Sequence, residues 1–251
     1  MIIKKTNQIP WCPKLRGATD NIWYPAYVQR KIDGEYALIH YNDGDIYTCN
    51  KRGLVRSHFP ALYGIQSKLD KAGIKEITLI AELYFGDGKN HSLYKLLANK
   101  RSDLINIYVH DVMETEKTTS ERIVMLQNMD LCPEYKLVED DAQTQEVFEK
   151  TIAEGYEGIV IKPCVAKLYM SSKWVKMKSE DETEMAVTNL CPGQERIELS
   201  FMKDNVIVSV GAKCDNNMKR TLKVGDCVIV KHFGFLKSGV RNPIVIKKGE
   251  K

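Results

Sequence analysis

The chain lacks the features that would place it in a membrane, outside the cell or around a structural metal. Its 251 residues contain no apolar run near the ~18 residues of a membrane span. The first residues lack the apolar core of a secretory signal. The seven cysteines are widely spaced, odd in number and without a Cys-x-x-Cys pair, which argues against a disulfide framework and a zinc cluster. We therefore expect a cytoplasmic protein with reduced thiols and no membrane contact.

The sequence also lacks a phosphate-binding loop. Gly86-Asp87-Gly88-Lys89 comes nearest, but Leu83 stands where the first glycine belongs and Asn90 follows the lysine. Any nucleotide must be held in another way. With 43% hydrophobic and 28% charged residues, the chain is typical of a globular protein rather than a disordered one.

The sequence pattern of residues 1–188 predicts one α+β domain. Asn42-Asp43-Gly44 separates two β-rich segments, which indicates a hairpin. Apolar spacing predicts helices over 59–72 and 142–154, and Thr119 and Ser120 before Glu121 predict a capped helix. The remaining predicted elements are a helix over 92–100 and strands over 77–85, 104–113, 157–162 and 174–178.

Residues 189–251 have a different sequence pattern from residues 1–188. A Pro-Gly turn at 192–193 precedes short strands separated by glycine turns, which predicts a small β-barrel, plausibly an OB-fold. Residues 201–251 carry 11 Lys and Arg against 4 Asp and Glu, whereas the whole chain has a net charge of only +4. The basic charge is thus concentrated in the predicted barrel.

Lys31-Ile32-Asp33-Gly34 contains a candidate nucleophile. A lysine at the end of a strand can attack an electrophile when a cationic neighbour or a dry pocket favours its neutral amine. Alone this pattern is common by chance, and a solvated lysine at a turn is the simpler interpretation.

Further charged residues that could serve the same site follow Lys31 along the chain. Arg52 follows the hairpin, Glu82 lies inside an apolar strand, Glu157 heads another strand, and Lys176 and Lys178 share one strand face. Each alone has a simpler explanation, such as edge lysines exposed to solvent. Together, at strand positions that could line one cleft, they favour a catalytic site.

This ordered set resembles the covalent nucleotidyltransferases, most closely the small ATP-dependent DNA ligases of viruses and phages. The motifs are KIDG (31–34), KRG (51–53), AELYF (81–85), YVHDVM (108–113), EGIVIK (157–162) and KMK (176–178). The resemblance implies a nucleotidyltransferase domain of ATP-grasp-like antiparallel sheets with helices (1–188), then an OB-fold domain (189–251). It further implies ATP and Mg²⁺ (or Mn²⁺) as cofactors and nicked duplex DNA as substrate in repair or replication. We expect a monomer in the cytoplasm, or inside a host cell if viral.

The resemblance also assigns roles on the nucleophile's side of the site. Lys31 would take AMP as a phosphoramidate and release pyrophosphate, with Asp33 orienting or activating it. AMP would then move to a 5′-phosphate at a nick, and the 3′-hydroxyl would displace it. Lys176 and Lys178 would contact the α-phosphate, since cations stabilise a transferring phosphoryl group.

Other residues would hold the nucleotide and metal. By the same resemblance, Arg52 and Glu82 would hold the ribose and the neighbouring phosphate, and Glu157 and Glu82 would help to place Mg²⁺. His110 stands where an aromatic residue stacks on adenine. Arg241, Lys247 and Lys248 are candidates for contacting pyrophosphate.

Two departures and two alternatives accompany this resemblance. Tyr36 replaces the family's usual arginine and His110 its usual aromatic residue, so nucleotide affinity or base choice is expected to differ. An RNA ligase or an mRNA-capping guanylyltransferase is the alternative enzyme, and a nucleic-acid-binding OB protein the non-enzymatic one. Loss of the lysines and glutamates would favour the latter, but they are intact.

Overall fold

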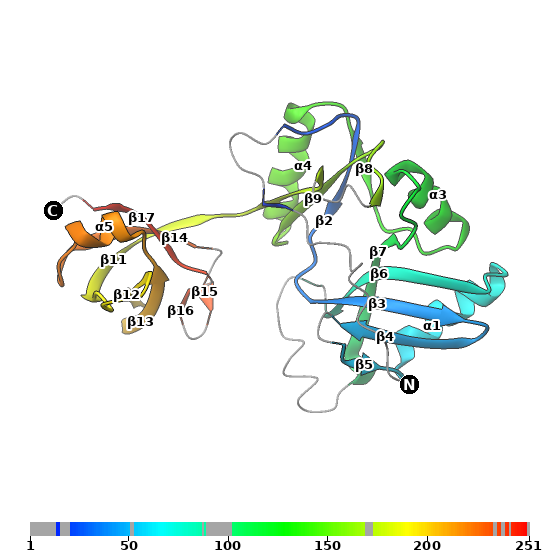
Figure 1. Cartoon of the computed structure of the whole chain (residues 1–251), viewed down its shortest axis with the longest axis horizontal. Coiled ribbons are helices and arrows are strands. Elements are labelled where there is room, and N and C mark those ends of the chain that lie inside the picture. Colours follow the sequence, from blue (N-terminus) through cyan, green and yellow to red (C-terminus); the bar gives the residue numbers. More distant parts are fainter. Residues whose placement is uncertain are drawn as a thin grey trace. The chain divides into compact units, whose positions relative to one another are not determined.

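The structure is a computed structural model that divides into two compact units between Met177 and Lys178 (Figure 1). It describes residues 14–15, 21–50, 53–86, 88, 102–168, 173–232, 235–236, 239–240 and 242–249. Sequence analysis predicted the boundary after residue 188. The units divide earlier because strand β11 (Asp181–Asn189) pairs with β12 (Arg196–Lys203) and β14 (Cys227–His232). The helix predicted over 92–100, and the candidates Arg52 and Arg241, lie outside the described residues.

The first unit contains an antiparallel sheet in the order β5-β4-β3-β6-β7. Its strands are β3 (Glu35–Asn42), β4 (Asp45–Asn50), β5 (Val55–Arg56), β6 (Glu76–Phe85) and β7 (Ile105–Val112), the last preceded by the 3₁₀ turn η1 (Ser102–Leu104). The predicted hairpin is present, and Asp43 and Gly44 turn it with φ of 44° and 93°. Helix α1 (Pro60–Lys71) packs its buried Leu62 and Leu69 into the core on one face of this sheet.

The second sheet of this unit has the order β1-β10-β9-β2-β8. Its strands are β1 (Lys14–Leu15), β2 (Ala26–Arg30), β8 (Lys136–Val138), β9 (Gly158–Pro163) and β10 (Val175–Lys178). Val28, Ile159, Ile161 and Val175 pack on one face with helix α4 (Asp141–Ala153). Side chains that alternate with these therefore face the other way.

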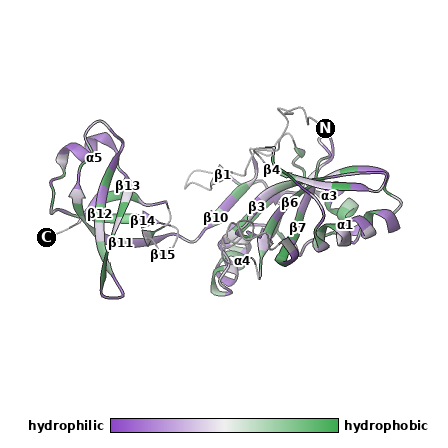
Figure 2. Cartoon of the chain, turned by 90° about the horizontal axis from the view of Figure 1, so that it is seen from below, coloured by the Kyte–Doolittle hydropathy of each residue, from purple (hydrophilic) through white to green (hydrophobic). Residues whose placement is uncertain are grey.

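Helix α3 (Thr119–Asn128) begins at a capping box. The Thr118 hydroxyl accepts from the Glu121 backbone N–H, and the Glu121 carboxylate accepts from the Thr118 backbone N–H. The cap is thus Thr118, just before the predicted pair. The helices of this unit carry hydrophobic and hydrophilic residues side by side, as amphipathic helices do (Figure 2). An α+β architecture with antiparallel sheets is confirmed.

The second unit is built around a closed barrel in the order β11-β12-β13-β17-β14. Its further elements are β13 (Val206–Lys213), α5 (Asn216–Thr221), the pair β15 (Phe235–Leu236) and β16 (Gly239–Val240), and β17 (Ile244–Lys248). A separate core fills this barrel, with Ile197, Leu199 and Val230 fully buried. None of the described helices in either unit is long and apolar enough to cross a membrane.

Candidate active site

Lys31 and Glu157 meet at one end of two paired strands. Lys31 directly follows β2, and its backbone N–H donates to the Gly158 carbonyl at 2.8 Å. Its ammonium contacts the carboxylate of Glu157, which directly precedes β9. The two side chains are 21% and 9% exposed, so the pair is largely shielded from water. Antiparallel pairing of β2 with β9 thus joins two motifs that are far apart in sequence.

The loop that carries Lys31 lies directly on β6. A Cβ on Gly34 would lie 2.2 Å from the Leu83 carbonyl oxygen and 2.8 Å from Glu82 Cγ, closer than real atoms approach. Glycine is required here because the loop backbone touches the strand. Asp33 is buried, and its backbone N–H donates to the Gly88 carbonyl at 2.9 Å. This close packing brings Glu82 beside the nucleophile's loop.

His110 presents a neutral ring to the same region. Burial lowers the pKa of His110 to about 3, and the positive charges of Lys162 and Lys31 act in the same direction. The ring centroid lies 6.5 Å from that of Tyr36, at an interplanar angle of 56°. An uncharged imidazole beside the Lys31 ammonium has the chemistry to pack against a nucleobase.

The motif lysines occupy one strand face. Val175 and Met177 pack with the α4 core, so Lys176 lies on the face of β10 away from α4. That face also carries Lys162 of the neighbouring strand β9. Lys178 follows at the next alternate position and is the first residue of the second unit. The strands that carry or lead into the first and the last two motifs, β2, β9 and β10, are thus neighbours in one sheet.

The remaining candidates lie in the barrel. Lys247 and Lys248 end β17, and Lys248 Nζ contacts Asp226 Oδ2 at 2.6 Å. Lys248 therefore has a partner within its own unit.

Gln29 is a further candidate for the site, one that sequence reasoning missed. It is 4% exposed, and its Oε1 has no hydrogen-bond partner among the described residues. It alternates with Val28, which faces α4, so it lies on the same sheet face as Lys162. A buried acceptor without a partner is costly, and a ligand amino group could satisfy it. Only its place two residues before Lys31 could have suggested this.

The carboxylates suit a metal that arrives with the nucleotide. Within the described ranges, no three His, Cys, Asp or Glu side chains are grouped to hold an ion by themselves. Mg²⁺ commonly uses one or two carboxylates plus substrate phosphates and water. Glu157 and Glu82 therefore fit Mg²⁺ as partial ligands that a bound triphosphate would complete.

Known ligases resemble this chain in sequence. A DNA ligase of Saccharolobus islandicus is 27% identical over 194 residues, which cover 65% of this chain and 32% of that protein. The aligned region thus spans about a third of the length of the curated relatives it matches.

Solved ligase structures share the fold. A structure from work on Lig E DNA ligases and DNA binding with a minimal scaffold has a TM-score of 0.74 at 19% identity, covering 95% of this chain and 98% of that one. The ATP complex of the bacteriophage T7 ATP-dependent DNA ligase has a TM-score of 0.53 at 15% identity, covering 96% and 98%. The profile of the RNA ligase family matches residues 25–178, which is more than half of the chain. The chain therefore belongs to the RNA ligase family, within the covalent nucleotidyltransferases.

Proposed function

We propose that this chain is an ATP-dependent ligase that seals nicks in duplex DNA through lysyl-AMP at Lys31. The observation that carries the proposal is the contact of the Lys31 ammonium with Glu157, beside the neutral ring of His110. A lysine nucleophile, a carboxylate at its amine and a surface for a base are the parts that adenylylation needs.

The first step joins Lys31 Nζ to the α-phosphorus of ATP. The N–P bond forms as the bond from the α-phosphorus to the pyrophosphate oxygen breaks, and pyrophosphate leaves. The Lys31 ammonium gives one proton to Glu157, the carboxylate in contact with it, and so becomes the attacking amine. A second proton leaves the nitrogen as the N–P bond forms and is taken up by pyrophosphate or water. Mg²⁺, when bound, neutralises phosphate charge. AMP then passes to the 5′-phosphate of a nick, and the 3′-hydroxyl displaces it.

Other residues bind and orient the nucleotide in this proposal. Asp33 orients the loop of the nucleophile, Arg52 and Glu82 hold the ribose and its neighbouring phosphate, and Lys176 and Lys178 contact the α-phosphate. The two lysines lie ~7 Å apart along one face of β10, and their flexible side chains allow both ammonium groups to converge on one anionic group.

The second unit would serve as an OB-fold domain that grips DNA. Its closed five-stranded barrel fits that fold class, and the basic excess of residues 201–251 fits a polyanionic partner. The enzyme would act as a monomer on the nick.

An RNA ligase is the second candidate, because the matching family profile is that of RNA ligases. Nick substrates distinguish the two candidates. All-DNA nicks and nicks with ribonucleotides on the 3′ or the 5′ side are offered separately, and preference for the all-DNA nick supports the DNA ligase.

The primary experiment incubates the protein with ATP and Mg²⁺ and measures its intact mass. A gain of one AMP, mapped by peptide analysis to Lys31 and absent from Lys31→Ala, is expected. A GMP adduct formed from GTP in preference to ATP would support a capping enzyme instead. No adduct with either nucleotide would refute lysyl-nucleotide chemistry.

A further inference from the structure

Strand β7 carries a β-bulge at His110. Ile80 of β6 pairs with Asp111 and the next residue, Ala81, pairs with Val109, so His110 is the extra residue. Val109 and Val112 both pack into the core beneath the sheet, although they are three positions apart. The bulge therefore lets both intervening side chains, His110 and Asp111, leave that core.

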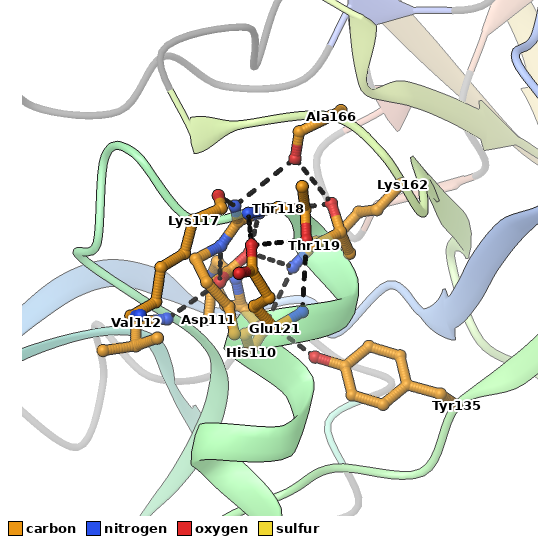
Figure 3. A network of polar contacts seen from close by, with 11 residues as sticks. His110, Asp111, Val112, Lys117, Thr118, Thr119, Glu121, Tyr135, Lys162 and Ala166 are labelled. Atoms are coloured by element: carbon orange, nitrogen blue, oxygen red, sulfur yellow. Dashed lines mark hydrogen bonds and ion pairs between the residues drawn. The ribbon is translucent and has the colours of Figure 1, made fainter.

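Asp111 lies between two buried cations, Arg122 and Lys162. Figure 3 shows its contact with Lys162. Arg122 Nε donates to its Oδ1 at 2.7 Å, and Lys162 Nζ donates to its Oδ2 at 3.0 Å. The three side chains are 0%, 1% and 3% exposed for Arg122, Lys162 and Asp111. Buried charges are tolerated only when they are paired in good geometry, so this cluster fixes its members in place.

The same lysine also holds the bulged backbone. Lys162 Nζ donates to the His110 carbonyl at 2.6 Å, and the Tyr135 hydroxyl donates to that carbonyl at 3.0 Å. The ammonium lies 4.3 Å from the ring centroid of Trp174. The Lys162 ammonium, which has three N–H groups, thus contacts a carbonyl, a carboxylate and an aromatic face. Lys162 is arranged to act through His110 rather than on the nucleotide itself.

We propose that Lys162 is a positioning residue for the nucleotide base. It fastens the His110 carbonyl to the Asp111 carboxylate and so holds the bulge that turns the His110 ring toward the Lys31 site. This proposal rests on the proposed function. Strand β9 follows Glu157 directly and carries Lys162, so one strand sets both the partner of the nucleophile and the ring that meets the base.

The experiment compares Lys162→Met with Lys162→Arg and with Lys136→Met, which removes an exposed lysine from β8, an edge strand of the same sheet. Single-turnover lysyl-AMP formation is measured across ATP concentrations. For Lys162→Met, the ATP concentration at half-maximal rate should rise about tenfold, as expected for a weakened base contact. Its rate at saturating ATP should stay within about threefold of the parent. Lys162→Arg should recover part of the affinity, and Lys136→Met should match the parent.

A second readout needs no nucleotide. NMR of the His110 ring should give a higher pKa in Lys162→Met than in the parent, because a neighbouring positive charge is lost and the ring is released from its site. Absence of lysyl-AMP in the parent protein would refute the proposed function. The titration would still test whether Lys162 positions His110.

Two results would overturn the proposal. One is unchanged ATP saturation and His110 titration in a folded Lys162→Met protein. The other is a loss of rate at saturating ATP without a change in half-saturation, which would make Lys162 a catalytic residue. If Lys162→Met does not fold, Tyr135→Phe tests the proposal in its place, since it removes only the other hydrogen bond to the His110 carbonyl. It should raise the half-saturating ATP concentration about threefold, and an unchanged value overturns the proposal.

Discussion

The Lys31 ammonium contacts the Glu157 carboxylate because β2 and β9 pair antiparallel and the two residues flank the same end of that ladder. Before the lysine reacts, the contact pairs a positive ammonium with a negative carboxylate. In the proposed reaction, AMP converts the amine to a phosphoramidate, and the lysine loses its positive charge. Glu157, the proton acceptor in this proposal, then loses its ion-pair partner. The pair thus links the charge around Glu157 to the state of the nucleophile.

Glu157→Gln should slow lysyl-AMP formation about 100-fold, because an amide holds the amine but cannot take its proton. The measurement is the single-turnover rate of AMP transfer to the protein. Glu154→Gln is the matched control, since Glu154 lies nearby and pairs with Arg30 at 2.9 Å on a more exposed surface. A rate for Glu157→Gln within about threefold of the parent would contradict the role of Glu157 as proton acceptor.

Gly34→Ala should impair both folding and adenylylation. The new Cβ would lie 2.2 Å from the Leu83 carbonyl oxygen, which belongs to the backbone of β6 and cannot move aside cheaply. We expect a loss of about 1–3 kcal/mol in the free energy of unfolding, measured by urea denaturation. We also expect slower lysyl-AMP formation, because the loop that carries Lys31 must shift.

Gly64→Ala is the control for that substitution. Gly64 lies inside α1, and a Cβ there meets no atom within 4 Å. Alanine should therefore raise the free energy of unfolding by about 0.5–1 kcal/mol and leave adenylylation unchanged. If Gly34→Ala behaves like Gly64→Ala, the close packing of the loop on β6 is not required.

Sequence patterns predicted the local elements well. The Asn42-Asp43-Gly44 turn and the apolar spacing of α1 are decided by residues close in the chain, and both predictions are confirmed. The pairing that brings Lys31 to Glu157 depends on contacts across 126 positions. Local propensity carries no information on such pairing, so the resemblance of the motifs was needed to suggest it.

The parts that sequence reasoning missed are tertiary in origin. The bulge at His110 left one signal, the spacing of Val109 and Val112 by three rather than two, but a strand of eight residues gives too little periodicity to decide. The burial of Arg122 had no signal, since a charged residue on a helix is usually exposed. The domain boundary was predicted too late in the chain because β11 carries three acidic residues and does not resemble a barrel strand.

Stability should fall as the pH drops from 6.5 toward 4.5, since the folded chain holds His110 neutral. Burial, together with Lys162 and Lys31, lowers the pKa of His110 to about 3, while the unfolded chain takes up this proton near 6.5. The unfolded state therefore binds more protons between these values, and acidification costs on the order of 1 kcal/mol per pH unit. Urea denaturation at several pH values measures this slope.

His110→Gln should flatten that slope. Burial also lowers the pKa of His40, which contributes in the same direction, so His40→Gln is measured beside it. We expect the larger change from His110→Gln. Equal slopes in His110→Gln and the parent would show that the neutral ring is not held by the fold.

Gln29→Leu should separate stability from nucleotide binding. The Gln29 Oε1 atom is buried and has no hydrogen-bond partner among the described residues, so replacing the amide with an apolar group of similar size should leave stability unchanged or raise it. If this acceptor receives a ligand amino group, its loss should raise the half-saturating ATP concentration about fivefold to tenfold. Gln145→Leu, on the exposed face of α4, is the matched control and should change neither property. A Gln29→Leu protein that saturates with ATP like the parent would mean that the acceptor does not meet the nucleotide.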